Sequence, residues 1–496
     1  MKRAWLTAVI FGALVAFAEP QSTDPSVLEA QLQQNPSDLP TRIALGRAYL
    51  EAGRYEDAAR LFEDVLALDY NNFAAHFGLG LAHYRQGNLK AARFEFEQLT
   101  HLYPERFEGW YNLAVVYAQA NNWEAATEAF TRAIELGEAQ DLATPELKQA
   151  YLGLAEAHRK QGRPDQAAEV LKRALARFEG DLEVTYLLAE NLTLAGEALE
   201  AIPHLYSVLQ KDRGHVAAVS LLADIYVGQG LRDRALRELD RSLAQAADPR
   251  IQAQLLLKKA LLLQGAQPHQ SRELLEQAVQ LDPDLWQAHY NLGVAWLKAG
   301  DPSRAMQSFR LAYRLQPNEP RVLLGMAVAA DQLGESAEAL RFAGLAAAIA
   351  EGRTKAEALV LIGKSAYRLG RYDAALEALG QAVALDDQDG QAWLWLGLAA
   401  YAARDFSRAV EALERAVAID GSLTARMNLG AAYLAVKRFS DAERVLTQVV
   451  LEDANNAEAW YNLGWALKAL ARDQEALRAW KKALELGYEP ARGLVD

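Results

Sequence analysis

Apolar residues recur at three- and four-residue steps along nearly the whole chain from residue 39 onward. This spacing places them on one face of a helix, and it predicts amphipathic α-helices packed against neighbours. Three segments show the pattern most fully, as two helices joined by a short turn: WYNLAVVYAQANNWEAATEAFTRAIEL from Trp110, HYNLGVAWLKAGDPSRAMQSFRLAYRLQP from His289 and WYNLGWALKALARDQEALRAWKKALEL from Trp460. The pattern indicates a series of helical hairpins.

Small residues set the register of these hairpins. Ala stands early in the second helix, mostly at intervals of 34 residues, at Ala58, Ala92, Ala126, Ala167, Ala201, Ala235, Ala305, Ala339, Ala375, Ala409, Ala442 and Ala476. Gly or Ala stands twelve residues earlier, in the first helix, at Gly46, Gly80, Ala114, Ala155, Ala189, Ala223, Gly293, Ala327, Gly363, Gly397, Gly430 and Gly464. We expect the two helices to cross closely where both are small, because overpacking such a contact costs about 1–3 kcal/mol.

The turn inside each hairpin is also readable. Gly falls seven residues after the small position, or after its equivalent place, at Gly53, Gly87, Gly162, Gly196, Gly230, Gly265, Gly300, Gly334 and Gly370. Gly adopts positive φ without steric cost and commonly follows the end of a helix. Arg404, Lys437 and Ala471 occupy the same place in later hairpins, while Pro283 and Pro317 mark boundaries where a helix must stop.

This 34-residue pattern resembles the tetratricopeptide repeat family over almost the whole chain after residue 38. We count thirteen units, at about 39–72, 73–106, 107–140, 148–181, 182–215, 216–249, 250–284, 286–319, 320–353, 356–389, 390–422, 423–456 and 457–490. The resemblance implies an all-α fold, a right-handed α-solenoid of stacked antiparallel helix pairs (a TPR superhelix). Unit 250–284 departs from the pattern, with Lys258 at the close-approach position and Ser271 in place of Ala, so the register of its first helix stays open.

Other segments lie outside the units, which form two runs at 39–140 and 148–490. Residues 141–147 separate the third and fourth units and are expected to be a longer loop or a hinge. Residues 19–38 form an N-terminal extension, in which VLEAQLQQNP resembles a lone second helix. Such a helix would cap the array, because the exposed stacking face of a terminal repeat is apolar. Residues 491–496 form a C-terminal tail.

The first 18 residues predict export. Lys2 and Arg3 precede an apolar run, residues 4–18, that ends in Ala-Phe-Ala, the pattern of a secretory signal peptide cleaved after Ala18. The run is shorter than the roughly 20 residues that cross a bilayer as a helix. The alternative is an uncleaved N-terminal anchor. Both interpretations place the rest of the chain outside the cytoplasm, in the periplasm or at the cell envelope, with no membrane span in the mature chain.

Composition removes several classes of function. The chain of 496 residues has no Cys, which excludes disulfides, thiolate zinc sites, iron–sulfur clusters and a Cys nucleophile. Its net charge of −13 argues against nucleic acid as a partner, since phosphate binding needs a basic surface. The acidic balance is expected mainly to keep a large surface soluble, although a basic partner segment would associate faster in such a field.

Two apparent motifs fit the repeat better than they fit a chemical site. The segment IGKS from Ile362 ends like a phosphate-binding loop, but Ala358 replaces the required earlier Gly and the segment lies inside a first helix. The carboxylates in 386–389 hint at a calcium loop, but Leu385 and Leu396 occupy its first and twelfth ligand positions. We interpret the second segment as a turn between repeats.

Catalytic and metal chemistry is likewise not indicated. His76 and His83 lie seven residues apart on one helix, without carboxylate or thiolate ligands at suitable spacing, so we expect packing and surface roles for them. No Ser-His-Asp set can be singled out, and no stretch outside the units approaches the roughly 50 residues of a small domain. We expect no enzyme activity, no cofactor and no metal site.

In the family, the first helices line a concave groove that binds peptide segments or partner helices. The groove-facing positions carried over to this sequence are Phe77, Tyr84, Tyr111, Asn112, Tyr186, Tyr290, Asn291, Tyr367, Trp395, Tyr401, Asn428, Tyr461, Asn462 and Trp465. Aromatic rings supply contact area with few rotatable bonds, and Asn both donates and accepts hydrogen bonds. The alternative for any one ring is that it fills space between adjacent helices.

Family members that hold a terminal carboxylate use Lys, Asn, Lys and Arg at set positions over three consecutive units. The best window in this chain matches at Lys259, Asn291 and Arg321. Leu255 and Gly325 occupy the remaining two positions, so a carboxylate clamp is not expected.

These observations favour a non-enzymatic scaffold for protein–protein interaction. It would bind peptide or protein segments in its groove and support assembly of a cell-envelope complex, of the pilus, polysaccharide-export or outer-membrane-biogenesis type. The alternative is an accessory protein of polysaccharide machinery that handles carbohydrate, with Trp395 and Trp465 stacked on sugar rings. An enzyme on the repeat surface is a third, disfavoured hypothesis.

Overall fold

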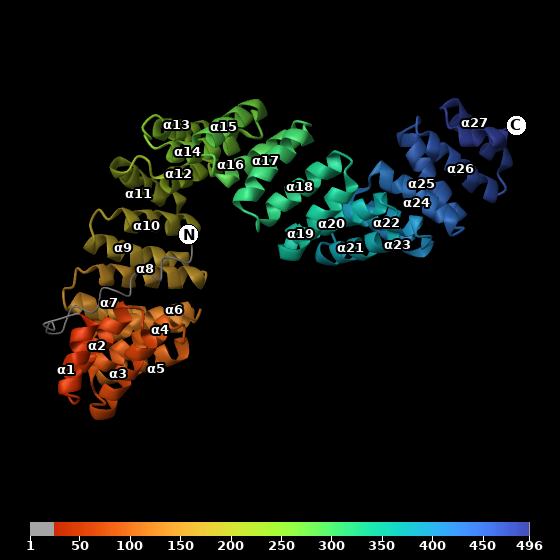
Figure 1. Cartoon of the computed structure of the whole chain (residues 1–496). Coiled ribbons are helices and arrows are strands. Elements are labelled where there is room, and N and C mark those ends of the chain that lie inside the picture. Colours follow the sequence, from red (N-terminus) through yellow and green to blue (C-terminus); the bar gives the residue numbers. More distant parts are fainter. Residues whose placement is uncertain (1–23, 496) are drawn as a thin grey trace. The chain divides into compact units, whose positions relative to one another are not determined.

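The computed structural model describes residues 24–495, and these residues form helices and short connections without a strand (Figure 1). Two compact units divide the chain between Ala246 and Ala247, and we call them the N-terminal and the C-terminal unit. The signal-like segment predicted at residues 1–18 lies outside the described residues. Every helix in the described part falls short of the length and apolar character that a membrane span requires.

The N-terminal unit holds one lone helix and six helix pairs. Helix α1 (Pro25–Gln34) packs against α2, and its Leu28 is buried there. The pairs are α2 (Leu39–Glu51) with α3 (Tyr55–Leu68), α4 (Phe73–Arg85) with α5 (Leu89–Leu102), α6 (Phe107–Gln119) with α7 (Trp123–Ala139), α8 (Pro145–Lys160) with α9 (Pro164–Arg177), α10 (Leu182–Leu194) with α11 (Ala198–Lys211) and α12 (Val216–Gly228) with α13 (Arg232–Leu243).

The C-terminal unit holds seven further pairs, followed by the short helices η2 (Glu489–Ala491) and α28 (Arg492–Val495). The pairs are α14 (Pro249–Leu263) with α15 (Pro268–Leu281), α16 (Trp286–Lys298) with α17 (Pro302–Leu315), α18 (Pro320–Gln332) with α19 (Ser336–Ile349), α20 (Gly352–Arg368) with α21 (Tyr372–Leu385), α22 (Gly390–Ala402) with α23 (Phe406–Asp420), α24 (Leu423–Ala435) with α25 (Phe439–Glu452) and α26 (Ala457–Ala469) with α27 (Asp473–Glu485). The predicted fold class, an all-α solenoid of stacked antiparallel helix pairs, is confirmed.

Small residues in the first helices make room for a bulky side chain of the second helix. A Cβ atom added to Gly293 would lie 2.6 Å from the ring of Phe309, and one added to Gly363 would lie 2.3 Å from Cγ of Leu379. The expected partner was the Ala twelve residues later, Ala305 in the first case. The nearest atoms belong instead to the residue sixteen later, because its longer side chain reaches across the helix crossing.

Eight of the nine predicted turn glycines adopt positive φ, as expected, at Gly53, Gly87, Gly162, Gly196, Gly230, Gly300, Gly334 and Gly370. Arg404, Lys437 and Ala471 adopt the same conformation without Gly, with φ of 64°, 64° and 60°. The prediction is wrong for Gly265, which is not among the positive-φ residues. There the amides of Ala266 and Gln267 both donate to the carbonyl of Leu263, so α14 ends in a different turn.

The pair α14–α15, which departs from the repeat pattern in sequence, is joined by a hydrogen bond of its own. Ser271 is buried and its Oγ donates a hydrogen bond to the carbonyl of Ala260, 2.8 Å away. The Ser271 hydroxyl therefore has a hydrogen-bond acceptor on the first helix, at the position where the other pairs have Ala. This bond joins the two helices of the unit whose register the sequence left open.

The segment between α7 and α8 is shorter than the seven residues expected from the repeat spacing. Helix α7 runs on to Ala139 and α8 begins at Pro145, so only residues 140–144 connect them. Arg177 of α9 holds this connection: its Nε donates to the carbonyl of Leu142 at 2.7 Å and its Nη2 lies 2.6 Å from Oδ1 of Asp141. The structure thus shows a short connection tied to the next helix pair.

The first helices form the inner, more closely packed row of the C-terminal unit. Each contacts the next first helix along the chain, from α16 with α18 to α24 with α26, whereas successive second helices of this unit do not approach as closely. Elements that touch their next-but-one neighbours lie on the inner side of a stack. We call the surface of α14, α16, α18, α20, α22, α24 and α26 the first-helix face of the C-terminal unit.

Candidate functional site

Several predicted groove residues lie together on the first-helix face. The rings of Tyr367 and Trp395, on α20 and α22, have centroids 5.7 Å apart at an interplanar angle of 66°. On α26 the rings of Tyr461 and Trp465 lie edge to face at 6.3 Å. Tyr401 and Trp465 are the most exposed members of the predicted set, each with 40% of its surface accessible. Tyr367, Trp395 and Tyr461 are half-buried and present only part of each ring to the surface.

The predicted groove residues on α4 and α6 are buried. Phe77 and Tyr111 pack edge to face on the core rings of Phe96 and Phe130, and Asn112 is buried beside Tyr111. Burial raises the pKa of Tyr111, because a phenolate would lose its hydration there. Tyr84 is buried as well, and burial raises its pKa too. In the described structure these four side chains fill space between helices.

Two further predicted tyrosines are half-buried. Tyr186 lies 5.1 Å from the ring of His215, and burial, with Glu190 nearby, raises the pKa of Tyr186 to about 12. Tyr290 packs on Phe309 at 5.8 Å, and burial likewise raises its pKa. Each presents only part of its ring to the surface.

Three of the four predicted asparagines donate a side-chain hydrogen bond within their own helices. Nδ2 of Asn112, Asn291 and Asn428 donates to the backbone carbonyl four residues earlier, at 2.8, 2.7 and 2.8 Å. Asn291, Asn428 and Asn462 are half-buried. For Asn291 and Asn428 the side-chain oxygen faces no hydrogen-bond donor that the structure assigns, so these amides can still accept a bond from a partner's backbone.

The groove prediction missed a cationic cluster beside Trp395. Nζ of Lys364 lies 2.8 Å from Oδ2 of Asp331 and 5.5 Å from the centroid of the Trp395 ring. Arg368, one turn further along α20, pairs with the other carboxylate oxygen of Asp331. The available signal was positional, since Lys364 and Arg368 occupy one face of a first helix next to the predicted Tyr367.

Two of the residues that match a carboxylate clamp, Arg321 and Asn291, already make contacts within the chain. Nε of Arg321 lies 2.7 Å from Oε1 of Glu319, and this ion pair lowers the pKa of Glu319. The Arg321 guanidinium also lies 5.8 Å from the centroids of both Trp286 and Tyr290. Together with the internal bond of Asn291, these contacts leave no open Lys–Asn–Arg set at this place.

The apparent motifs take structural roles. Gly363 of the IGKS segment lies against Leu379 in the middle of α20. Asp389 caps α22, with Oδ1 accepting from the amides of Gln391 and Ala392. His76 is buried and hydrogen-bonds Glu95, with 2.6 Å between Nδ1 and Oε2. Within the described residues, no group of three or more His, Asp and Glu side chains is arranged to hold a metal ion.

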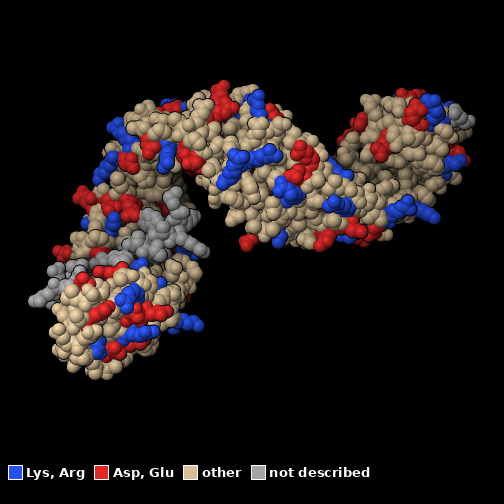
Figure 2. All heavy atoms as spheres, viewed as in Figure 1, with Lys and Arg blue, Asp and Glu red and all other residues tan. Residues whose placement is uncertain are grey.

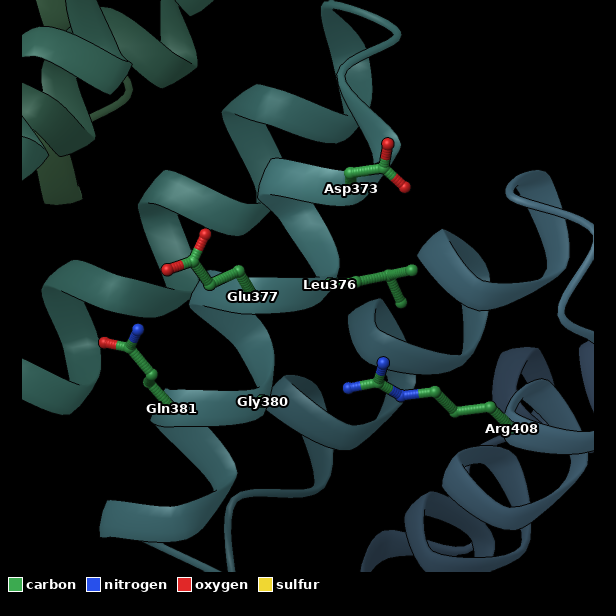
Figure 3. A pocket seen from close by; sticks show the side chains of 6 residues that line it. All are labelled: Asp373, Leu376, Glu377, Gly380, Gln381 and Arg408. Carbon is green, nitrogen blue, oxygen red and sulfur yellow. The ribbon is translucent and has the colours of Figure 1, made fainter.

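A cleft of about 580 Å³ lies between two second helices, α21 and α23. Arg408 extends from α23 toward Gly380, where a Cβ atom would lie 3.3 Å from the guanidinium (Figure 3). Glu377 and Gln381 on α21 line the cleft further from Arg408 (Figure 3). None of the predicted groove residues lines this cleft, so it is a separate feature of the second-helix surface.

The stacked helix pairs define a repeat protein of the α-solenoid class, a scaffold suited to protein–protein interaction. Models of the tetratricopeptide repeat match most of the sequence, at 43–99, 152–216, 257–320 and 360–423 for one model, 105–180 for a second, 192–260 and 400–469 for a third, and 457–486 and 320–344 for two more. The chain belongs to the tetratricopeptide repeat family.

Individual relatives are distant. Human protein O-mannosyl-transferase TMTC1 is 26% identical over 195 residues, which are 39% of this chain and 21% of that protein. The chain thus spans about a fifth of the length of this curated relative. The crystal structure of the APC/C hetero-tetramer Cut9-Hcn1 is similar at 16% identity and a TM-score of 0.40, covering 95% of this chain and 98% of that one. Pseudomonas aeruginosa pilF is similar at 23% identity and a TM-score of 0.38, covering 44% and 96%.

Proposed function

We propose that this protein is a non-catalytic scaffold that binds peptide or protein segments along the first-helix face of its C-terminal unit. The observation that carries the proposal is the set of exposed and half-buried rings on the first helices α20, α22 and α26, with Tyr367 and Trp395 in contact across α20 and α22. Rings held by such packing lose little entropy on binding, so a partner gains contact area at low cost.

A peptide-selection experiment tests this proposal. A library of random 16-residue peptides is selected on the full chain, and the affinities of the selected peptides are measured for variants. We expect Trp395→Ala combined with Trp465→Ala to weaken binding at least tenfold. The matched control is Phe94→Ala, which removes an exposed ring from the second helix α5. Equal affinities for both variants and the parent chain would refute the proposed surface.

We further propose that the scaffold works outside the cytoplasm, in assembly of a cell-envelope complex of the pilus, polysaccharide-export or outer-membrane-biogenesis type. The support is the signal-like sequence of residues 1–18. The test is the intact mass and N-terminal sequence of the protein isolated from cell fractions. We expect a chain that begins at Glu19 in the envelope fraction. A full-length chain in the cytoplasmic fraction would contradict export.

The second candidate function is binding of polysaccharide. The exposed ring of Trp465 favours it, because an open aromatic face can stack on a sugar ring. Calorimetry with soluble cell-wall glycans tests this candidate on the same double tryptophan variant. Glycan binding that depends on Trp395 and Trp465, without selection of any peptide, would favour carbohydrate over protein as the partner.

A further inference from the structure

Acidic residues are nearly absent from the first helices of the C-terminal unit. These seven helices carry eleven Lys and Arg but only three Asp and Glu, a net charge of +8. The second helices α15 to α27 also carry eleven basic residues, but fourteen acidic ones, a net charge of −3. The chain as a whole has a net charge of −13, so these seven helices differ from the rest in sign. Some of their cations pair with carboxylates outside the first helices, as Arg426 does with Glu452 and Lys468 with Asp473.

The N-terminal unit does not share this separation. Its first helices, α2, α4, α6, α8, α10 and α12, carry six basic and seven acidic residues. Figure 2 shows both charge signs interspersed on the visible surface of the chain. The basic character is therefore a property of one row of helices in one unit and not of the repeat in general.

Lys364, Arg368 and Asp331 form the centre of this basic row. The carboxylate of Asp331, only 9% exposed, pairs with both cations and leaves the group with one net positive charge. The side chains of Lys364 and Arg368 remain 23% and 38% exposed. A buried carboxylate that holds two partly open cations side by side fixes their positions before any ligand arrives.

Aromatic rings lie beside cations on both sides of α20 along the row of first helices. Trp395 of α22 lies under the Lys364 ammonium and in contact with Tyr367. On α18 the Arg321 guanidinium lies near Trp286 and Tyr290, at 5.8 Å from each centroid. Other charged groups on α18 and α20 are Glu357, which pairs with Arg353 at 3.1 Å, and Lys355. Cations and rings therefore lie near one another along four neighbouring first helices, α16, α18, α20 and α22.

We propose that this face selects an acidic segment of a partner protein, with Asp or Glu side chains on Lys364 and Arg368 and an apolar side chain against Trp395. The proposal rests on the proposed function and adds the chemistry of the partner. Charge complementarity between the basic face and a carboxylate-rich segment is the argument for it. A short segment suits the site better than a long polyanion, because the second helices beside it carry the opposite net charge.

The experiment uses the full chain and three fluorescein-labelled probes. The first is a 12-residue peptide with four Glu residues and one Phe, the second is the same peptide with Gln in place of Glu, and the third is an oligogalacturonate of equal charge. Affinity is measured by fluorescence anisotropy at 50 and 300 mM NaCl. We expect the Glu peptide to bind at least tenfold more tightly than the Gln peptide at 50 mM, with this advantage reduced at 300 mM.

The decisive variant combines Lys364→Gln with Arg368→Gln. The matched control combines Arg408→Gln with Arg415→Gln on the second helix α23, which changes the total charge equally within the same unit. We expect the first variant to weaken binding of the Glu peptide at least tenfold and the control to change it less than twofold. If the first variant loses helicity, Arg368→Gln alone keeps the pair of Lys364 with Asp331 and should weaken binding at least threefold.

Four results would overturn the proposal. Equal losses in both double variants would show a general charge effect, and equal affinities of the Glu and Gln peptides would show no preference for acidic side chains. Tighter binding of the oligogalacturonate than of the Glu peptide would assign the face to anionic glycans. Ring-dependent binding of selected uncharged peptides, together with failure of the Glu peptide, would leave the proposed function standing and remove only this inference.

Discussion

Gly293 of α16 lies directly against the ring of Phe309 in α17, so closely that a Cβ atom on Gly293 would be 2.6 Å from the ring. The same ring also meets Gly325 of the next first helix, where a Cβ atom would lie 2.7 Å away. Phe309 thus joins two successive repeats, and it is fully buried between them. A bulky side chain that packs between two glycines therefore connects these neighbouring repeats.

We therefore expect Gly293→Val to destabilise the C-terminal unit by about 1–3 kcal/mol, because the added branches overpack the contact with Phe309. The matched control is Gly344→Val on α19, where an added Cβ meets nothing within 4 Å. Since Val is a better helix former than Gly, this control should leave stability unchanged or slightly raised. Urea unfolding followed by circular dichroism measures both, and equal midpoints would contradict the packing argument.

Ala471 adopts φ of 60° at the end of α26, where most other pairs place Gly. We expect Ala471→Gly to stabilise the chain by a few tenths of a kcal/mol up to about 1 kcal/mol, because Gly has no Cβ penalty in this conformation. Ala418→Gly, at an exposed position inside α23, should destabilise by about 0.5–1 kcal/mol. Thermal unfolding measures the change in stability of each variant, and the two changes should have opposite signs. A loss of stability in both variants would show that the positive φ at Ala471 carries no strain.

Asp331 holds two cations while being nearly buried itself. We expect Asp331→Asn to cost about 1–3 kcal/mol, because Lys364 and Arg368 then repel each other without a compensating carboxylate. Asp473→Asn removes an exposed partner of Lys468 and should cost less than about 1 kcal/mol, as surface ion pairs do. The comparison of urea midpoints measures the difference, and no difference between the variants would show that the Asp331 cluster adds nothing to stability.

Tyr433 is buried on α24, with its hydroxyl donating to Oε1 of Glu414 at 2.7 Å. Burial and this bond raise the pKa of Tyr433 to about 12 from its ordinary value of 10. The folded state therefore binds the phenolic proton more tightly than the unfolded state does, and its stabilisation is complete below pH 10. It should be lost as the pH rises from 10 towards 12.

We expect stability to fall less steeply over this alkaline range in Tyr433→Phe than in the parent chain. The measurement is the urea midpoint at several pH values from 8 to 11.5. Tyrosinate absorbance, as the difference between parent and variant, gives the midpoint of Tyr433 itself. A difference midpoint near 10 would contradict the raised pKa.

Spacing along the sequence was enough to predict the helix pairs and, except in unit 250–284, their register. The 34-residue interval between small residues places Gly293 and its equivalents in the first helices, and the structure has a helix pair at every predicted unit. Local periodicity suffices because an amphipathic helix and its Gly-ended turn depend on neighbours within a few residues. The different turn at Gly265 shows the limit, since a backbone bond to Leu263 decides the conformation there.

The sequence by itself determined the class of fold and the places of the helix pairs, because these follow from amphipathic spacing within a helix and from the 34-residue interval between small residues. Only the tertiary structure decided which rings remain open, as the buried Tyr111 and the exposed Trp465 occupy first helices of similar pattern. It also decided that Lys364 meets Asp331, 33 residues away on the preceding first helix. Burial and ion pairing depend on how successive repeats pack, and side chains from separate repeats meet only once the stack has formed.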